Sequence, residues 1–119
     1  MIHQSDVLIY HNPHCSKSRA TLELLRQNGF EPTVVEYLKN PPDRQTLAHI
    51  LTLLGADPRD LMRKREAAYA ANSLQDPSLS RDQLIAAMVA NPILIERPIV
   101  LANSKAVVGR PPENILKIL

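Results

Sequence analysis

The stretch from residue 7 to residue 38 alternates between strand-like and helix-like composition, and this alternation restricts the fold more than any other feature of the chain. "VLIY" at 7–10 is a short apolar run rich in strand formers, and "TVVEYL" at 33–38 has the same character. Between them, "SKSRATLELLRQNG" from Ser16 has no internal proline and closes with Asn28-Gly29, which is typical of a helix end. A β-α-β unit has a right-handed crossover, so the two strands are predicted to be parallel.

The predicted first helix carries most of its apolar side chains on one side. Ala20, Leu24 and Leu25 share a face of this helix, and Leu22 lies nearby. We expect this face to be the buried one.

Residues 41–92 carry helical patterns only. "PPDRQTLAHILTLLG" has apolar residues at i, i+3, i+4 and i+7 and ends at Gly55, while "EAAYAAN" is a short helical piece. "DPRDLMRK" offers Asp57 as an N-cap with Pro58 at the first helical position, and "SRDQLIAAMVANP" opens with a Ser-x-x-Gln capping box at Ser80. The positions expected to be buried are Leu47, Ile50, Leu51, Leu54, Leu84, Ile85, Met88 and Val89. The middle of the chain is therefore predicted to be an all-helical block.

The end of the chain returns to strand composition. "PIVLA" at 98–102 and "KAVVG" at 105–109 flank a polar Asn103-Ser104 pair, which predicts an antiparallel hairpin, and "PPENILKIL" predicts a helix with proline near its start. The fold class is therefore α/β: β-α-β and β-β-α halves that form a thioredoxin-like mixed four-stranded sheet, with an all-helical insert between them. We expect one domain over residues 1–119. Its core comprises 1–40 and 93–119, and the insert comprises 41–92.

Charge and composition exclude several classes of protein. Lysine and arginine total 14 against 12 acidic residues, and a net charge of +2 is too small to indicate nucleic-acid or membrane binding. The start of the chain lacks the features of a signal peptide, so we expect a cytoplasmic protein. A single cysteine cannot form an internal disulfide or a cysteine-based zinc site, and His3, His14 and His49 show no ligand spacing. Aromatic residues make up 3% of the chain, which predicts an aliphatic core.

The one cysteine, Cys15, lies in the polar stretch "YHNPHCSKSR". A cysteine kept for packing would be expected on an apolar face, whereas this one stands where a strand gives way to a helix. The helix N-terminus, Lys17 and Arg19 supply positive potential that favours the thiolate, and His11 would add to it if it were charged. We therefore interpret Cys15 as a reactive thiol rather than an inert one.

Ser18 stands where a dithiol motif would have its second cysteine. The chain therefore cannot resolve an intermediate on Cys15 by itself, and any redox cycle must use a thiol from outside. A serine here can donate a hydrogen bond to the sulfur or to a substrate.

Three arginines fall at points of structural interest: Arg63 in "LMRK", Arg97 before Pro98, and Arg110 in "GRPP". In a thioredoxin-like topology, the residue before the proline that opens the third strand lies beside the start of the first helix, where that X-Pro bond is commonly cis. Each arginine alone could be a solvated surface group. Together with a thiolate they would form a clamp for a tetrahedral oxyanion.

His11 precedes Asn12-Pro13 in the same stretch as the cysteine. It could tune the thiolate or orient the loop, and capping of the turn is an equally good interpretation.

Four segments resemble, in order and spacing, the glutaredoxin-linked arsenate reductase family: "IYHNPHCSKSR", "LMRK", "NPILIERPIV" and "GRPPE". The resemblance implies an enzyme with no bound cofactor, in which Cys15 attacks arsenate, glutathione reduces the adduct and glutaredoxin recycles the thiol. It also implies that Arg63, Arg97 and Arg110 bind the oxyanion, with His11 as the nearby histidine.

Two alternative functions remain open, and the first of them resembles this chain in fold. Spx-type regulators bind RNA polymerase and usually sense redox state through a CxxC pair, which Ser18 interrupts here. A monothiol oxidoreductase acting on glutathione mixed disulfides would also need only one cysteine.

Overall fold

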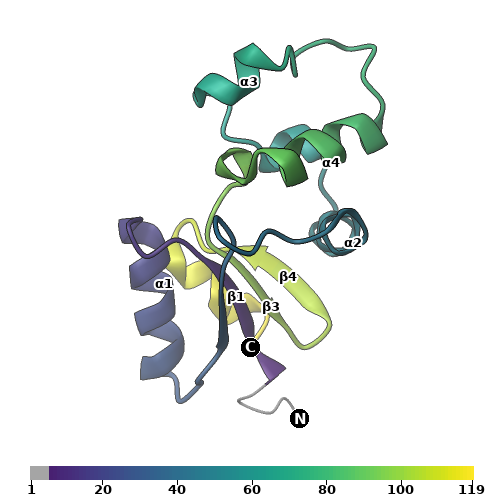
Figure 1. Ribbon diagram of the computed structural model, residues 1–119. Coiled ribbons are helices and arrows are strands. Elements are labelled where there is room, and N and C mark those ends of the chain that lie inside the picture. Colours follow the sequence, from purple (N-terminus) through teal and green to yellow (C-terminus); the bar gives the residue numbers. More distant parts are fainter. Residues whose placement is uncertain (1–5) are drawn as a thin grey trace. The chain divides into compact units, whose positions relative to one another are not determined.

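The computed structural model describes residues 6–119, which form two compact units (Figure 1). One unit comprises the chain up to Asn40 together with Arg97–Leu119, and the other comprises Pro41–Glu96. The single domain expected over residues 1–119 stays a prediction. His3, one of the histidines without metal-ligand spacing, lies outside the described residues.

A four-stranded sheet forms the centre of the first unit, with the order β2-β1-β3-β4. The strands are β1 (Leu8–His11), β2 (Thr33–Glu36), β3 (Ile99–Ala102) and β4 (Lys105–Val108). β1 pairs with β2 in parallel, whereas β1 with β3 and β3 with β4 are antiparallel. The predicted mixed sheet of a thioredoxin-like fold is confirmed.

The hairpin between β3 and β4 turns without a glycine. Asn103 and Ser104 both have left-handed backbones, with φ of 55° and 59°. Two consecutive left-handed residues form the type I′ turn that matches the twist of paired strands, and asparagine tolerates this conformation better than most residues. The predicted hairpin is therefore confirmed.

Helix α1 (Ser16–Gln27) follows β1 and buries a more polar face than we expected. Its buried residues are Ser18, Thr21 and Leu25, while Leu22 and Leu24 are half-buried. Ala20 is exposed, so its predicted place on the buried face is wrong. The hydroxyl groups of Ser18 and Thr21 find hydrogen-bond partners inside the protein, which allows these two residues to take the inward positions.

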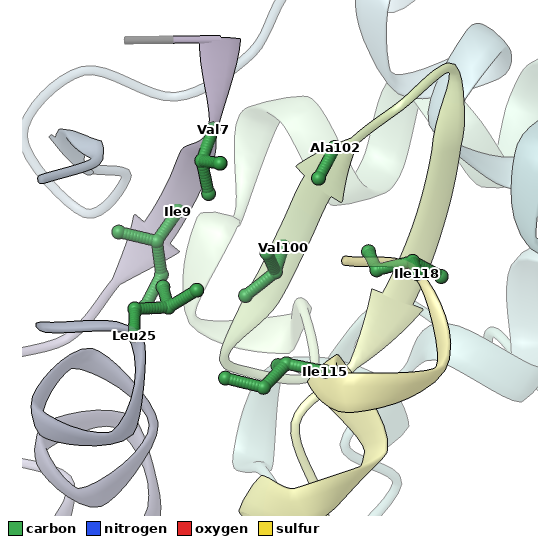
Figure 2. Packing of buried hydrophobic residues seen from close by; sticks show 7 residues of the cluster. All are labelled: Val7, Ile9, Leu25, Val100, Ala102, Ile115 and Ile118. Carbon is green, nitrogen blue, oxygen red and sulfur yellow. The ribbon is translucent and has the colours of Figure 1, made fainter. Parts of the chain in front are cut away.

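An aliphatic cluster holds α1 and the C-terminal segment against the sheet. Figure 2 shows side chains from β1, β3 and α1 pointing toward those of the last residues of the chain. The buried members are Val7, Ile9, Leu25, Val100, Ala102, Ile115 and Ile118. Ile115 belongs to η4 (Pro112–Lys117), a 3-10 helix that packs against α1 where the sequence predicted a helix. This cluster holds the C-terminal half of α1 and the η4 segment against β1 and β3.

The second unit is helical, as predicted for the insert. It contains α2 (Arg44–Leu54), η2 (Pro58–Leu61), α3 (Ala67–Ala71), α4 (Arg81–Ala90) and η3 (Pro92–Leu94). α4 packs against α2, η2 and η3. Within residues 6–119, no helix is both long and apolar enough to cross a membrane.

The ends of these helices follow the sequence signals closely. Gly55 closes α2 with a φ of 64°, and Ser80 forms the predicted capping box with Gln83. Asp57 and Pro58 begin η2, which is a single 3-10 segment. Most of the predicted buried positions are buried, whereas Leu54 and Val89 are only half-buried.

Candidate active site

A hydrogen-bonded turn carries the chain from β1 to α1 and places Cys15 at the N-cap of the helix. The Asn12 side chain accepts a hydrogen bond from the backbone N–H of His14 at 3.0 Å, and the Asn12 carbonyl accepts one from the Cys15 N–H at 3.0 Å. Cys15 has an extended backbone, and its carbonyl accepts the first helical hydrogen bond, from Arg19. The thiol is half-buried at the positive end of the helix, as predicted.

The surroundings of Cys15 favour its ionised form. Partial burial raises the pKa of the thiol, but the backbone N–H groups of Ser18 and Lys17 and the guanidinium of Arg97 lower it by more, so the pKa lies below its usual value. The Cys15 side chain makes no ordinary capping hydrogen bond, so these N–H groups act mainly through their partial positive charge. The thiolate is the reactive form of cysteine, and it is favoured here.

Two of the three predicted arginines lie beside the sulfur. Arg97 donates a hydrogen bond to Cys15, and its Nε and Nη1 atoms are buried. The Nη1 atom of Arg110 lies 4.0 Å from the Cys15 sulfur and donates to the Arg97 carbonyl at 3.2 Å. The Arg97-Pro98 peptide bond is cis, as the topology predicted, and the Arg110-Pro111 bond is also cis. The strands β3 and β4 thus bring two guanidinium groups to one thiol.

His11 ends β1 and is buried against Ser18. Its Nδ1 lies 2.6 Å from the Ser18 hydroxyl oxygen, which also accepts a hydrogen bond from the Asn12 backbone N–H at 3.0 Å. Burial lowers the pKa of His11 further than the facing Glu36 carboxylate raises it, and Arg19 and Arg26 add to the lowering. A neutral imidazole can accept the Ser18 proton on Nδ1.

Ser18 is fully buried, and its hydroxyl holds the turn from inside. Asn12 is the residue of this turn that the sequence analysis did not single out. An asparagine before a proline in a strand-to-helix loop is the signal from which it could have been identified.

Arg63 belongs to the second unit. It follows Met62, whose backbone pairs with Ile95, and its guanidinium forms ion pairs with Glu66 at 3.2 Å and Glu96 at 3.8 Å. Its predicted contact with an oxyanion stays a prediction.

Beyond the imidazole of His11 lies a cavity of about 250 Å³. Its lining residues are His11, Asn12, Pro13, His14, Glu36, Leu38 and Lys39. The cavity therefore borders the turn that carries the thiol. Among the described residues, no group of three or more histidine, cysteine, aspartate or glutamate side chains could hold a metal ion.

Comparison with known proteins gives a consistent result. The chain is 57% identical to the uncharacterized protein YfgD of Escherichia coli, over 95% of this chain and 96% of the relative. It is 49% identical to the arsenate reductase of Neisseria meningitidis serogroup A, over 96% of this chain and 98% of the relative. The solved structure of an arsenate reductase from Vibrio cholerae superimposes with a TM-score of 0.92 at 49% identity, covering 95% of this chain and 97% of the other. Residues 10–118 match the ArsC family, and the chain belongs to that family.

Proposed function

We propose that this protein is an arsenate reductase that uses Cys15 as its nucleophile and takes electrons from glutathione and glutaredoxin. The observation that carries the proposal is the pair of guanidinium groups at the one thiol: Arg97 hydrogen-bonded to the sulfur and Arg110 at 4.0 Å. Arsenate is a tetrahedral oxyanion, so its oxygens suit planar cationic donors while its arsenic faces the thiolate.

The first step joins the Cys15 sulfur to arsenic. The thiolate attacks As(V), an arsenate oxygen leaves as water after taking up protons, and arsenic keeps its oxidation state in the S–As adduct. Arg97 and Arg110 neutralise the charge on the remaining oxygens.

The second stage transfers two electrons to arsenic. A glutathione thiolate attacks the Cys15 sulfur, a disulfide forms, and the electron pair of the broken S–As bond stays on arsenic, which leaves as arsenite. A glutaredoxin thiol then attacks the glutathione sulfur and releases the Cys15 thiolate. Overall, arsenate and two thiols give arsenite, a disulfide and water. Because the chain has one cysteine and that cysteine is regenerated in each cycle, both of these thiols must come from outside.

The other predicted site residues have supporting roles in this proposal. His11 and Ser18 hold the turn that presents the thiol, so we assign Ser18 a positioning role in place of the substrate contact we first expected. The resemblance also assigns Arg63 to the oxyanion, and that assignment stays a prediction. A reducing compartment such as the cytoplasm would keep Cys15 available for each cycle.

A coupled assay tests the reaction. Purified protein with glutathione, glutaredoxin, glutathione reductase and NADPH should consume NADPH when arsenate is added, and Cys15→Ser should abolish this. No arsenate-dependent consumption would refute the named reaction. Faster turnover of a glutathione mixed disulfide would favour the monothiol oxidoreductase instead, and capture of RNA polymerase would favour an Spx-type regulator.

A further inference from the structure

A close contact between Thr21 and Gly109 joins helix α1 to the loop after β4. Thr21 is fully buried, and its hydroxyl shares one proton between the Lys17 carbonyl at 2.8 Å and the Gly109 carbonyl at 3.3 Å. A threonine in mid-helix ordinarily satisfies its hydroxyl with the carbonyl four residues earlier. The additional Gly109 acceptor therefore links this helix to a loop 88 residues away in sequence.

Gly109 has no space for a side chain. A Cβ atom at this position would lie 2.6 Å from the Thr21 hydroxyl oxygen, 3.0 Å from its methyl carbon and 2.9 Å from Cγ of Pro98. Its backbone is not in the left-handed region, so conformational freedom is not the reason for glycine here. Glycine is needed at this position because two other segments, α1 at Thr21 and the chain at Pro98, approach it closely.

The same glycine is connected to both arginines that contact the thiol. Its N–H donates to the Pro98 carbonyl at 2.9 Å, and Pro98 directly follows Arg97. On its other side it directly precedes Arg110, whose guanidinium reaches the Arg97 carbonyl and the Cys15 sulfur. The helix that Thr21 belongs to begins immediately after Cys15.

We propose that the contact between Thr21 and Gly109 is a positioning contact that sets how closely Arg97 and Arg110 approach the Cys15 sulfur. Sulfur, guanidinium groups and helix all meet through this one junction, so a small displacement there moves the cations relative to the thiol. The inference rests on the proposed function only where arsenate serves as the probe, because the ionisation of Cys15 can be measured without it.

Gly109→Ala is the main test. The added methyl group must push Thr21 and Pro98 apart, and a displacement of about 1 Å in a catalytic arrangement can cost about a hundredfold in rate. We expect the Cys15 pKa, measured from the rate of alkylation by iodoacetamide against pH, to rise toward that of a free thiol. The KM for arsenate should rise about tenfold or more, since a shift of about 1 Å is enough to weaken directional hydrogen bonds.

Gly55→Ala is the matched control for loss of stability. Gly55 has a φ of 64°, and no atom lies within 4 Å of the position that a Cβ would take, so alanine there strains the backbone without touching any neighbour. This variant should be less stable, but its alkylation profile should match that of the unmodified protein. If Gly109→Ala behaves in the same way as Gly55→Ala, the glycine has only a structural role and the proposal is wrong.

Thr21 variants separate the hydroxyl from the bulk of the side chain. Thr21→Val should shift the alkylation profile in the same direction as Gly109→Ala. Thr21→Ser keeps the hydroxyl, so its alkylation profile should match that of the unmodified protein. Thr52→Val is the control, because Thr52 makes the same hydrogen bond to the carbonyl four residues earlier, at 3.0 Å, but is exposed. An unchanged profile in Thr21→Val would overturn the role of the hydroxyl.

The double variant Gly109→Ala with Thr21→Ala tests whether the two residues act through direct contact. Removing the Thr21 hydroxyl and methyl removes two of the three atoms nearest to the new Cβ. The shift of the Cys15 alkylation profile in the double variant should therefore be smaller than the sum of the shifts in Gly109→Ala and Thr21→Ala. Additive effects of the two substitutions would contradict a direct contact. If arsenate turnover is absent in every protein while the alkylation shifts are as expected, the proposed function fails and the positioning contact stands.

Discussion

The Nη1 atom of Arg110 lies 4.0 Å from the sulfur of Cys15, although 95 positions separate the two residues in sequence. The same Nη1 atom donates to the backbone carbonyl of Arg97, whose own guanidinium is hydrogen-bonded to the sulfur. Arg97 and Arg110 therefore depend on each other for their positions at the thiol.

Replacing Arg97 should separate thiol reactivity from anion handling. In Arg97→Ala the Cys15 pKa should rise, since the hydrogen bond and charge of Arg97 lower it in the unmodified protein. The thiol should remain fully alkylatable at high pH, while kcat/KM for arsenate falls by about tenfold or more. Arg26→Ala is the control, because Arg26 is exposed and pairs with Glu31 at the far end of α1. Unchanged arsenate kinetics in Arg97→Ala would refute the clamp.

Removing the Ser18 hydroxyl should destabilise the first unit. Ser18→Ala leaves the His11 imidazole and the Asn12 N–H without their buried partner, and a buried polar group without a partner costs about 1–3 kcal/mol. Chemical unfolding of the purified variant measures this loss. Ser78→Ala removes an exposed hydroxyl bonded to Asp76 and should change the free energy of unfolding by no more than about 0.5 kcal/mol. Equal effects of the two substitutions would contradict the importance of the buried network.

His11 should make the protein less stable in mild acid. Its pKa is lower in the folded protein than the usual value of about 6.5, so below that pH the unfolded chain binds a proton that the folded protein does not. The free energy of unfolding should therefore fall as the pH drops below about 6.5. The contribution of His11 to this fall should end once the pH is below the pKa of His11 in the folded protein. His11→Gln should lose this part of the dependence, measured by urea unfolding across pH. His14→Gln, at an exposed position in the same turn, should keep it. If the free energy of unfolding of His11→Gln falls more steeply in acid than that of the unmodified protein, folding does not lower the His11 pKa.

Leu25 should be essential to the attachment of α1. It is fully buried in the aliphatic cluster beneath the helix, and Leu25→Ala should cost about 2–5 kcal/mol of unfolding free energy. Leu116→Ala, at a position 49% exposed, should cost much less. Thermal unfolding of both variants checks the difference, and similar losses would mean that the cluster does not hold the helix.

Much of the fold could be predicted because local signals agreed with each other. The capping box at Ser80, the glycine at 55 and the Asn103-Ser104 pair all mark ends or turns that the structure contains. Ala20 was misplaced because apolarity alone suggested the buried face of α1. The true inward face carries Ser18 and Thr21, whose hydroxyls are satisfied by partners distant in sequence or in the preceding turn, and periodicity cannot reveal such partners.

The features of the site also divide into those that local sequence signals locate and those that only the folded structure brings together. Cys15 could be located from its polar neighbours and Arg97 from the proline that follows it, since both signals are local. The contact of Thr21 with Gly109 could not be predicted, because it depends on how closely two segments approach each other in the folded protein.

The most direct test of the account is the rate of alkylation of Cys15 by iodoacetamide as a function of pH, with and without arsenate. We predict a thiol pKa below the usual value of about 8.5 and slower alkylation when arsenate is present, because the anion would occupy the space between sulfur and guanidinium groups. An ordinary pKa together with no protection by arsenate would contradict the central claim that this thiol is an ionised nucleophile in an oxyanion site.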